Sequence, residues 1–130
     1  MAYAQQGFDW VSARAACSLG AMFETLRTQV RADVEAADQM RSEGENRYAF
    51  TFISQERMFA AVVEGTGIRH VISFKLHDGF ISVQDHERDL YQATVNLNDE
   101  GQCVIRVNAR EYAPWQFRKL ALESLLFTKY

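Results

Sequence analysis

The spacing of apolar residues changes after Arg47, and this change constrains the fold more than any other feature of the chain. Before Arg47, apolar residues recur every three or four positions, as they do on one face of a helix. After it they alternate with polar residues, as they do in strands of a half-buried sheet. The alternation is interrupted only by short turn-like segments, so we predict that consecutive strands pair side by side in an antiparallel sheet.

Four predicted turns set the register of this sheet. Asp78–Gly79 is typical of a type I′ turn, and the segment 98–101 (NDEG) of a type I turn followed by a glycine bulge. Two-residue turns are also predicted at Gln55–Glu56 and at Gly65–Thr66. All four turns place apolar residues on one face, which a slip of one residue would prevent. The predicted pairs are Phe52 with Phe59, Val63 with Ile68, Leu76 with Ile81, Phe74 with Val83, Leu97 with Cys103 and Val95 with Ile105. We therefore predict a six-stranded antiparallel meander.

The segment from Asp9 to about Ser42 is predicted to be helical. Asp9 suits the N-cap, and Gly44 suits the position just after the last turn. One helix of this length would extend about 50 Å, which is longer than a domain of this size. We predict a break near Ser18–Gly20, because Ser18 can cap a second helix and glycine is unfavourable inside one. The apolar stripe consists of Leu19, Phe23, Leu26, Val30, Val34 and Ala37.

The chain ends in a second helical segment, predicted to begin at Pro114 and to end near Phe127. Its apolar residues occupy nearly the whole circumference, which is typical of a helix buried on two sides. The order of helix, antiparallel sheet and helix indicates the α+β class. At 130 residues the chain is predicted to be a single domain, residues 1–130, with the C-terminal helix packed on the core.

The composition argues against several classes of function. The net charge is −3 and the basic residues are scattered, whereas nucleic acids and anionic membranes attract clustered basic residues. No signal peptide is evident at the N-terminus, and no apolar run is long enough to span a membrane. Cys17 and Cys103 have no metal-ligand spacing, so we predict reduced core thiols in a cytoplasmic protein. The alternative is a disulfide between them, which the cytoplasm disfavours. No cofactor is predicted.

Residues 77–90 (HDGFISVQDHERDL) contain two histidines and several carboxylates, which raises the question of a metal site. In the predicted register both histidines lie on the outer face, His77 at a turn and His86 near the far end of the ribbon. At about 3.3 Å per residue they are on the order of 20 Å apart, while zinc ligands lie about 2 Å from the metal. We therefore predict no metal site here.

A different group follows from the same register. His70 and Asp85 are in phase with the buried residues and lie on neighbouring strands, and Tyr91 begins the next strand. A histidine, a carboxylate and a tyrosine at the end of a sheet are candidates for a general base or a ligand pocket. The alternative is that the buried face simply ends there, with His70 half-buried and held by one hydrogen bond.

Apolar residues remain that the predicted core does not use. On the outer face of the first strands these are Met58, Val62 and Val71, and on the C-terminal helix they are Trp115, Leu122 and Leu126. Soluble monomers rarely expose large apolar patches, so these residues are candidates for an interface, most simply in a homodimer. The alternative is that residues 1–18 fold back over one of the two surfaces and leave a monomer.

Two functions of different classes follow. The first is a small cytoplasmic, non-enzymatic binding or regulatory protein that acts through an apolar protein–protein interface. The second is a small-ligand-binding protein or a hydrolase-like enzyme with a pocket around His70. The absence of a recognisable set of catalytic residues in the sequence favours the first.

Overall fold

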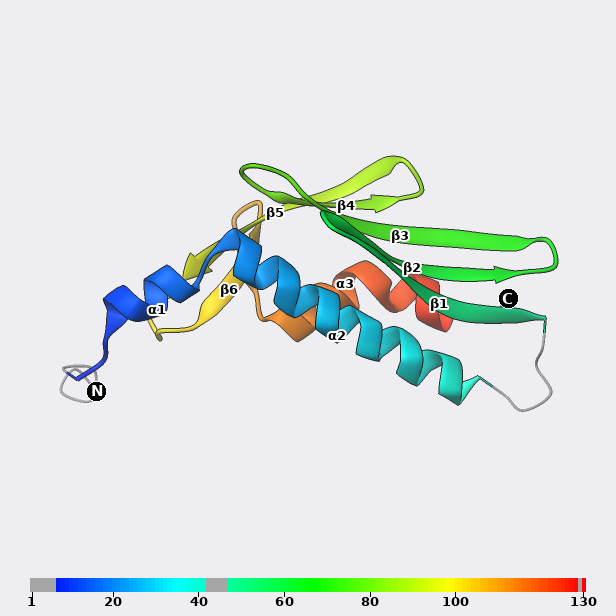
Figure 1. Ribbon diagram of the computed structural model, residues 1–130, viewed down its shortest axis with the longest axis horizontal. Helices are drawn as coiled ribbons and strands as arrows, with labels where there is room; N and C mark the ends of the chain where they lie inside the picture. The colour runs from blue at the N-terminus through cyan, green and yellow to red at the C-terminus, as the bar shows by residue number, and fades with distance from the viewer. Residues whose placement is uncertain (1–6, 42–46, 129) are drawn as a thin grey trace.

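The computed structural model of the chain describes residues 7–41, 47–128 and 130 (Figure 1). It is an open antiparallel sheet of seven strands with helices before and after it, which confirms the predicted α+β class. The elements in chain order are α1 (Trp10–Ala16), α2 (Leu19–Met40), β1 (Tyr48–Gln55), β2 (Met58–Gly65), β3 (Ile68–Leu76), β4 (Ile81–Asp85), β5 (Arg88–Leu97), β6 (Cys103–Val107), β7 (Arg110–Tyr112) and α3 (Pro114–Phe127). In the described part of the chain, no helix has both the length and the apolar character needed to cross a membrane.

The N-terminal helical segment is broken at the predicted place. Asp9 caps α1 by accepting a hydrogen bond from the Ser12 N–H (3.0 Å), and Ser18 caps α2 by accepting one from the Ala21 N–H (3.1 Å). These side chains satisfy backbone donors that have no partner within a helix. The predicted terminating residue Gly44 lies outside the described residues.

The prediction of six strands was wrong, because a seventh strand follows β6. The turn between β6 and β7 has Asn108 in the left-handed region (φ 57°), a conformation that asparagine tolerates better than most residues. β7 has only three residues, too few for an alternating pattern to be recognised in the sequence. All seven strands pair in chain order, so the sheet is a simple meander.

The predicted register is confirmed for two turns and wrong for two. Leu76 pairs with Ile81 and Leu97 with Cys103, as expected. The first two hairpins instead turn one residue later, at 56–57 and 66–67, which moves each pairing partner by two residues, so that Phe52 pairs with Ala61 and Val63 with His70. At the second of these turns Gly67 has a φ of +73°, a conformation that costs glycine little. A shift of two residues in the pairing keeps every side chain on the same face of the sheet. The residues predicted for the inner face therefore remain on it.

The inner face of the sheet packs against α2 and α3, which lie on the same side of it (Figure 1). Phe59 and Phe74 stack at the centre, with ring centroids 4.8 Å apart, and neither is exposed to solvent. Phe23 from α2 and Phe117 from α3 approach this pair, with centroids 4.9 Å from Phe59 and 6.2 Å from Phe74 respectively. Aromatic pairs at such distances contribute beyond the area that they bury.

Polar contacts fix the two long helices. Arg118 of α3 donates to Asp33 and to Gln29 of α2, both at 2.7 Å. At the end of α2, Asp38 accepts hydrogen bonds from Arg41 (2.7 Å) and from the Phe50 N–H at the sheet edge (3.0 Å). Burial alone would raise the pKa of Asp38, but these two hydrogen bonds and the charge of Arg41 outweigh it and lower the pKa. The carboxylate thus anchors α2 to β1.

Cys17 and Cys103 form a disulfide, with their Cα atoms 5.4 Å apart. The prediction of two reduced thiols was therefore wrong. The break between α1 and α2 places Cys17 beside the first residue of β6, although the two residues are 86 positions apart in the sequence. Only the folded geometry reveals this proximity, since disulfide formation depends on the distance and direction of the Cβ atoms.

Candidate functional site

His70 and Asp85 lie together at one end of the sheet, as the register predicted. His70 is on β3 and Asp85 is the last residue of β4, and His70 Nε2 lies 3.1 Å from Asp85 Oδ1. Their side chains are 22% and 26% exposed. The pair is therefore within hydrogen-bonding distance and partly shielded from water.

His86 joins this pair, although the sequence placed it on the outer face. Its ring stacks on that of His70, with centroids 5.7 Å apart, and its Nε2 lies 4.0 Å from Asp85 Oδ1. The reason is its backbone: His86 occupies the β4–β5 turn with a φ of 55°, so strand alternation no longer decides where its side chain points. His77 lies at the other end of β4, where it stacks on Phe80 and contacts Ser82 Oγ (2.9 Å).

Tyr91, the third predicted member, is displaced from this group. A bulge in the β4–β5 pairing aligns Tyr91 with Val83, whereas Asp85 pairs with Arg88. Two other tyrosines, Tyr48 and Tyr130, form a pair near this end of the sheet. Tyr130 packs on Tyr48 (centroids 5.4 Å apart) and donates to the Leu125 carbonyl (2.6 Å). Burial raises the pKa of Tyr130, and nearby Tyr48 and Asp85 raise it further, against a hydrogen bond with Thr128 that lowers it. No pattern in the sequence predicted the contact between Tyr48 and Tyr130.

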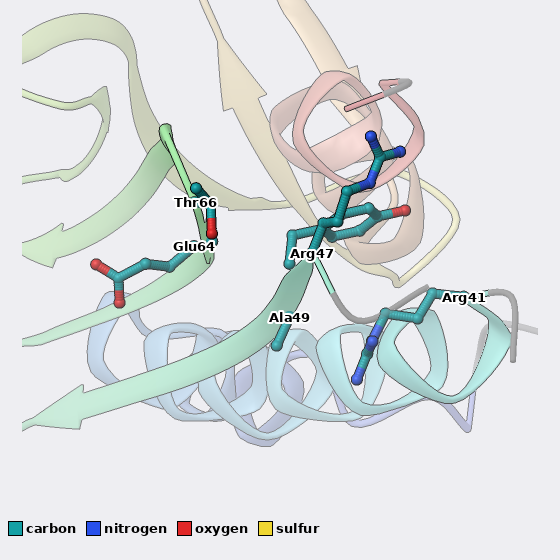
Figure 2. Close-up of a pocket in the computed structure, with 7 residues that line it drawn as sticks. Arg41, Arg47, Ala49, Glu64 and Thr66 are labelled. Carbon is teal, nitrogen blue, oxygen red and sulfur yellow. The ribbon is translucent and has the colours of Figure 1, made fainter. Parts of the chain in front are cut away.

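A pocket of about 600 Å³ opens beside β1 and β2, near this end of the sheet (Figure 2). Its charged side chains diverge: Glu64 points away from Arg41 and Arg47 in Figure 2. Glu64 pairs instead with Arg69 (2.5 Å), and Arg41 pairs with Asp38. A site for a charged ligand needs polar groups that converge, so this pocket lacks the usual features of one.

An apolar groove of about 400 Å³ runs between α2 and α3, and we call it the α2–α3 groove. Its rim carries three large and well-exposed apolar side chains, Met40 (77% exposed), Trp115 (57%) and Phe127 (74%). Two charged pairs flank it, Arg118 with Asp33 (2.7 Å) and Lys119 with Glu123 (3.1 Å). The groove is lined by Asp33, Ala36, Ala37, Met40, Trp115, Arg118, Lys119, Leu122, Glu123, Leu126 and Phe127.

The groove contains all three interface candidates from the C-terminal helix. Trp115 lies at the rim, Leu126 is half-buried, and Leu122 is buried in the floor (2% exposed). His70, Asp85 and His86 line neither this groove nor the pocket beside β1. The exposed apolar surface that the sequence indicated is therefore found on α3.

The candidates on the sheet are less accessible than predicted. Val62 is 2% exposed, while Met58 and Val71 are half-buried. Val62 lies on the second strand, between Thr51 and Val71 on the strands at either side, and these side chains shield one another. Ile53 is the member of this face that stays well exposed (40%).

Within the described residues, no three histidine, cysteine or acidic side chains are placed to hold a metal ion. Comparisons of the chain with protein-family models, with curated proteins and with solved structures found no match.

Proposed function

We propose that this chain is a non-enzymatic binding or regulatory protein that acts through an apolar protein–protein interface at the α2–α3 groove. The observation that carries the proposal is the exposure of Met40, Trp115 and Phe127 around a single apolar groove. Contiguous apolar surface on a soluble protein is typical of an interaction site. Tryptophan and methionine are also enriched at interfaces, where they fill pockets on the partner.

The charges beside the groove support a protein partner. Arg118 and Asp33 neutralise each other, as do Lys119 and Glu123, so the groove presents no net charge of either sign. A neutral apolar surface has no electrostatic attraction for a charged small molecule or a nucleic acid. We take a second copy of the chain as the partner, because two-fold homodimers are the commonest oligomers.

We expect the protein to scatter light as a dimer at micromolar concentration, with twice the 14.9 kDa mass of one chain. Trp115→Asp should weaken self-association about thirtyfold or more, because a buried tryptophan at an interface contributes about 2 kcal/mol or more. The substituted residue is 57% exposed in the single chain, so the fold should be preserved.

Leu120→Asp is the matched control on the same helix. Leu120 is 39% exposed and does not line the groove, so this variant should remain a dimer. A monomeric wild-type protein, or equal loss of the dimer in both variants, would contradict the proposal.

A second function is supported by the geometry of the sheet end, namely a small-ligand-binding protein or a hydrolase-like enzyme. There Asp85 lies 3.1 Å from His70 and can orient its ring, as the carboxylate of a histidine general base does. The side chains of His70 and Asp85 are 22% and 26% exposed, so solvent can reach the pair.

p-Nitrophenyl acetate tests this second function, since a histidine base accelerates its hydrolysis. If His70 acts as a base, His70→Ala should reduce the rate about a hundredfold, the usual contribution of general base catalysis. His77→Ala is the control, because His77 lies at the other end of β4 and contacts Ser82. Equal rates for the wild type and both variants would exclude a hydrolytic role for His70.

The disulfide is relevant to the cellular compartment in which the protein folds. The sequence led us to expect a cytoplasmic protein, but cytoplasmic thiols are kept reduced and disulfides persist in oxidising compartments. We propose that the chain matures in an oxidising compartment, supported by the bond between Cys17 and Cys103. Alkylation of the protein from its native source, with and without prior reduction, tests this. Two thiols that react without reduction would restore the cytoplasmic prediction.

A further inference from the structure

The helix α1 and the residue Phe8 before it carry a second apolar surface, which lies outside the core. The helix has no buried residue, and between residues 7 and 21 only Cys17 is buried. Phe8, Trp10 and Val11 are 42%, 62% and 59% exposed, and we call these three residues the α1 patch. Together, the α1 patch and the rim of the α2–α3 groove hold six of the eight large apolar side chains that are well exposed in the described part of the chain.

The disulfide fixes α1 in place. Cys17, at the end of α1, is bonded to Cys103 on β6, and the ring of Phe8 packs so closely on Gly101 that a Cβ there would come within 2.8 Å of it. The helix is therefore held against the β5–β6 end of the sheet at both of its ends. Trp10 and Val11 are thereby held in a defined position and stay well exposed, although the helix contributes nothing to the core.

The α1 patch lies too far from the groove of its own chain to occupy it. The two surfaces are at opposite ends of α2, as Figure 1 shows for the positions of α1 and of the last turn of α2. With 22 residues, α2 is about 33 Å long at 1.5 Å per residue. Because the disulfide prevents α1 from swinging along α2, only another molecule can bring an α1 patch to this groove.

We propose that the α1 patch of one copy occupies the α2–α3 groove of a second copy, and that the reciprocal contact closes a two-fold dimer. The inference rests on the proposed function, because it keeps the groove as the interface and names what fills it. A short helix with exposed apolar side chains, laid in a groove between two helices, is a common mode of recognition. Trp10 is the expected anchor, since a tryptophan in an apolar pocket is the usual centre of such an interface.

The charges of the two surfaces are compatible with this contact. Near the α1 patch, Asp9 is engaged by Ser12, and the Arg14 guanidinium lies 3.5 Å from the Cys17 carbonyl. In the groove, Arg118 and Lys119 are paired with Asp33 and Glu123. Asp99 and Glu100 share a hollow with Phe8 and Trp10 and make no ion pair among the described residues, so the contact must leave these two carboxylates at its exposed rim.

Complementation between two variants tests the proposal, with the disulfide kept oxidised throughout. Trp10→Asp damages the α1 patch and leaves the groove intact, while Trp115→Asp does the reverse. Each variant alone should be a folded monomer. Mixed in equal amounts, they should form a dimer, because one of the two contacts then joins an intact α1 patch to an intact groove. An affinity tag on one variant shows whether the other is retained with it, and circular dichroism confirms that both are folded.

The outcomes separate this inference from the proposed function. If Trp10→Asp dimerises like the wild type while Trp115→Asp is monomeric, the groove is the interface but α1 does not fill it. If both variants are monomeric and their mixture stays monomeric, α1 and the groove do not meet in the way proposed. If Trp115→Asp dimerises like the wild type, the proposed function fails as well.

Discussion

Phe74→Ala is expected to lower the free energy of unfolding by about 3 to 5 kcal/mol, the usual cost of removing a buried phenylalanine ring. Phe74 is not exposed at all and stacks on Phe59, with Phe117 of α3 against its edge. Its removal leaves a cavity where the sheet meets α3. Chemical denaturation with urea measures the loss, because a shift of the midpoint at constant slope reports a change in stability.

Ile53→Ala is the control. Ile53 is 40% exposed and lies outside both the α2–α3 groove and the α1 patch, so its truncation should change the free energy of unfolding by no more than about 0.5 kcal/mol. Equal midpoints for Phe74→Ala and the wild type would mean that the inner face of the sheet is not the core.

Loss of the disulfide is the second large effect that we expect. The bond joins residues 86 positions apart, and the chain-entropy model assigns a loop of this length about 4 to 5 kcal/mol of stability. The double variant Cys17→Ala/Cys103→Ala should therefore unfold at a much lower urea concentration than the oxidised protein.

The single variants provide the control for this experiment. Cys17→Ala and Cys103→Ala remove the same covalent bond, so each should lose nearly as much stability as the double variant, and the effects should not add. Reduction of the wild-type protein should produce the same loss. If the oxidised and reduced proteins unfold at the same midpoint, the two cysteines are not bonded in solution.

Local patterns in the sequence were sufficient to predict most of the fold. The alternation after Arg47 and the Asp78–Gly79 turn specify which residues face the core, because side chains of a strand alternate strictly between its two faces. The cap at Ser18 marks the break between α1 and α2, since its side chain accepts a hydrogen bond from the first turn of α2. Even the wrong positions of the first two turns left the buried face unchanged, because moving a turn by one residue moves each pairing partner by two, an even number.

The sheet-end group was predicted in part, and for the same reason. His70 and Asp85 belong to strands whose register follows from the Asp78–Gly79 turn, so their proximity could be derived. His86 and Tyr91 could not be placed in this way. His86 lies in a turn with a left-handed backbone, and Tyr91 follows a bulge, and both features interrupt the alternation on which the derivation depends.

Contacts between distant segments were decided only by the tertiary structure. Cys17 and Cys103 are joined because the break after α1 and the start of β6 meet in space, and no local pattern carries information about that distance. The α2–α3 groove likewise exists because Arg118 locks α3 beside α2, which leaves the apolar residues of both helices facing outward together. Periodicity along the chain determined which side of each element is apolar, whereas the packing of whole elements determined which of those sides stayed exposed.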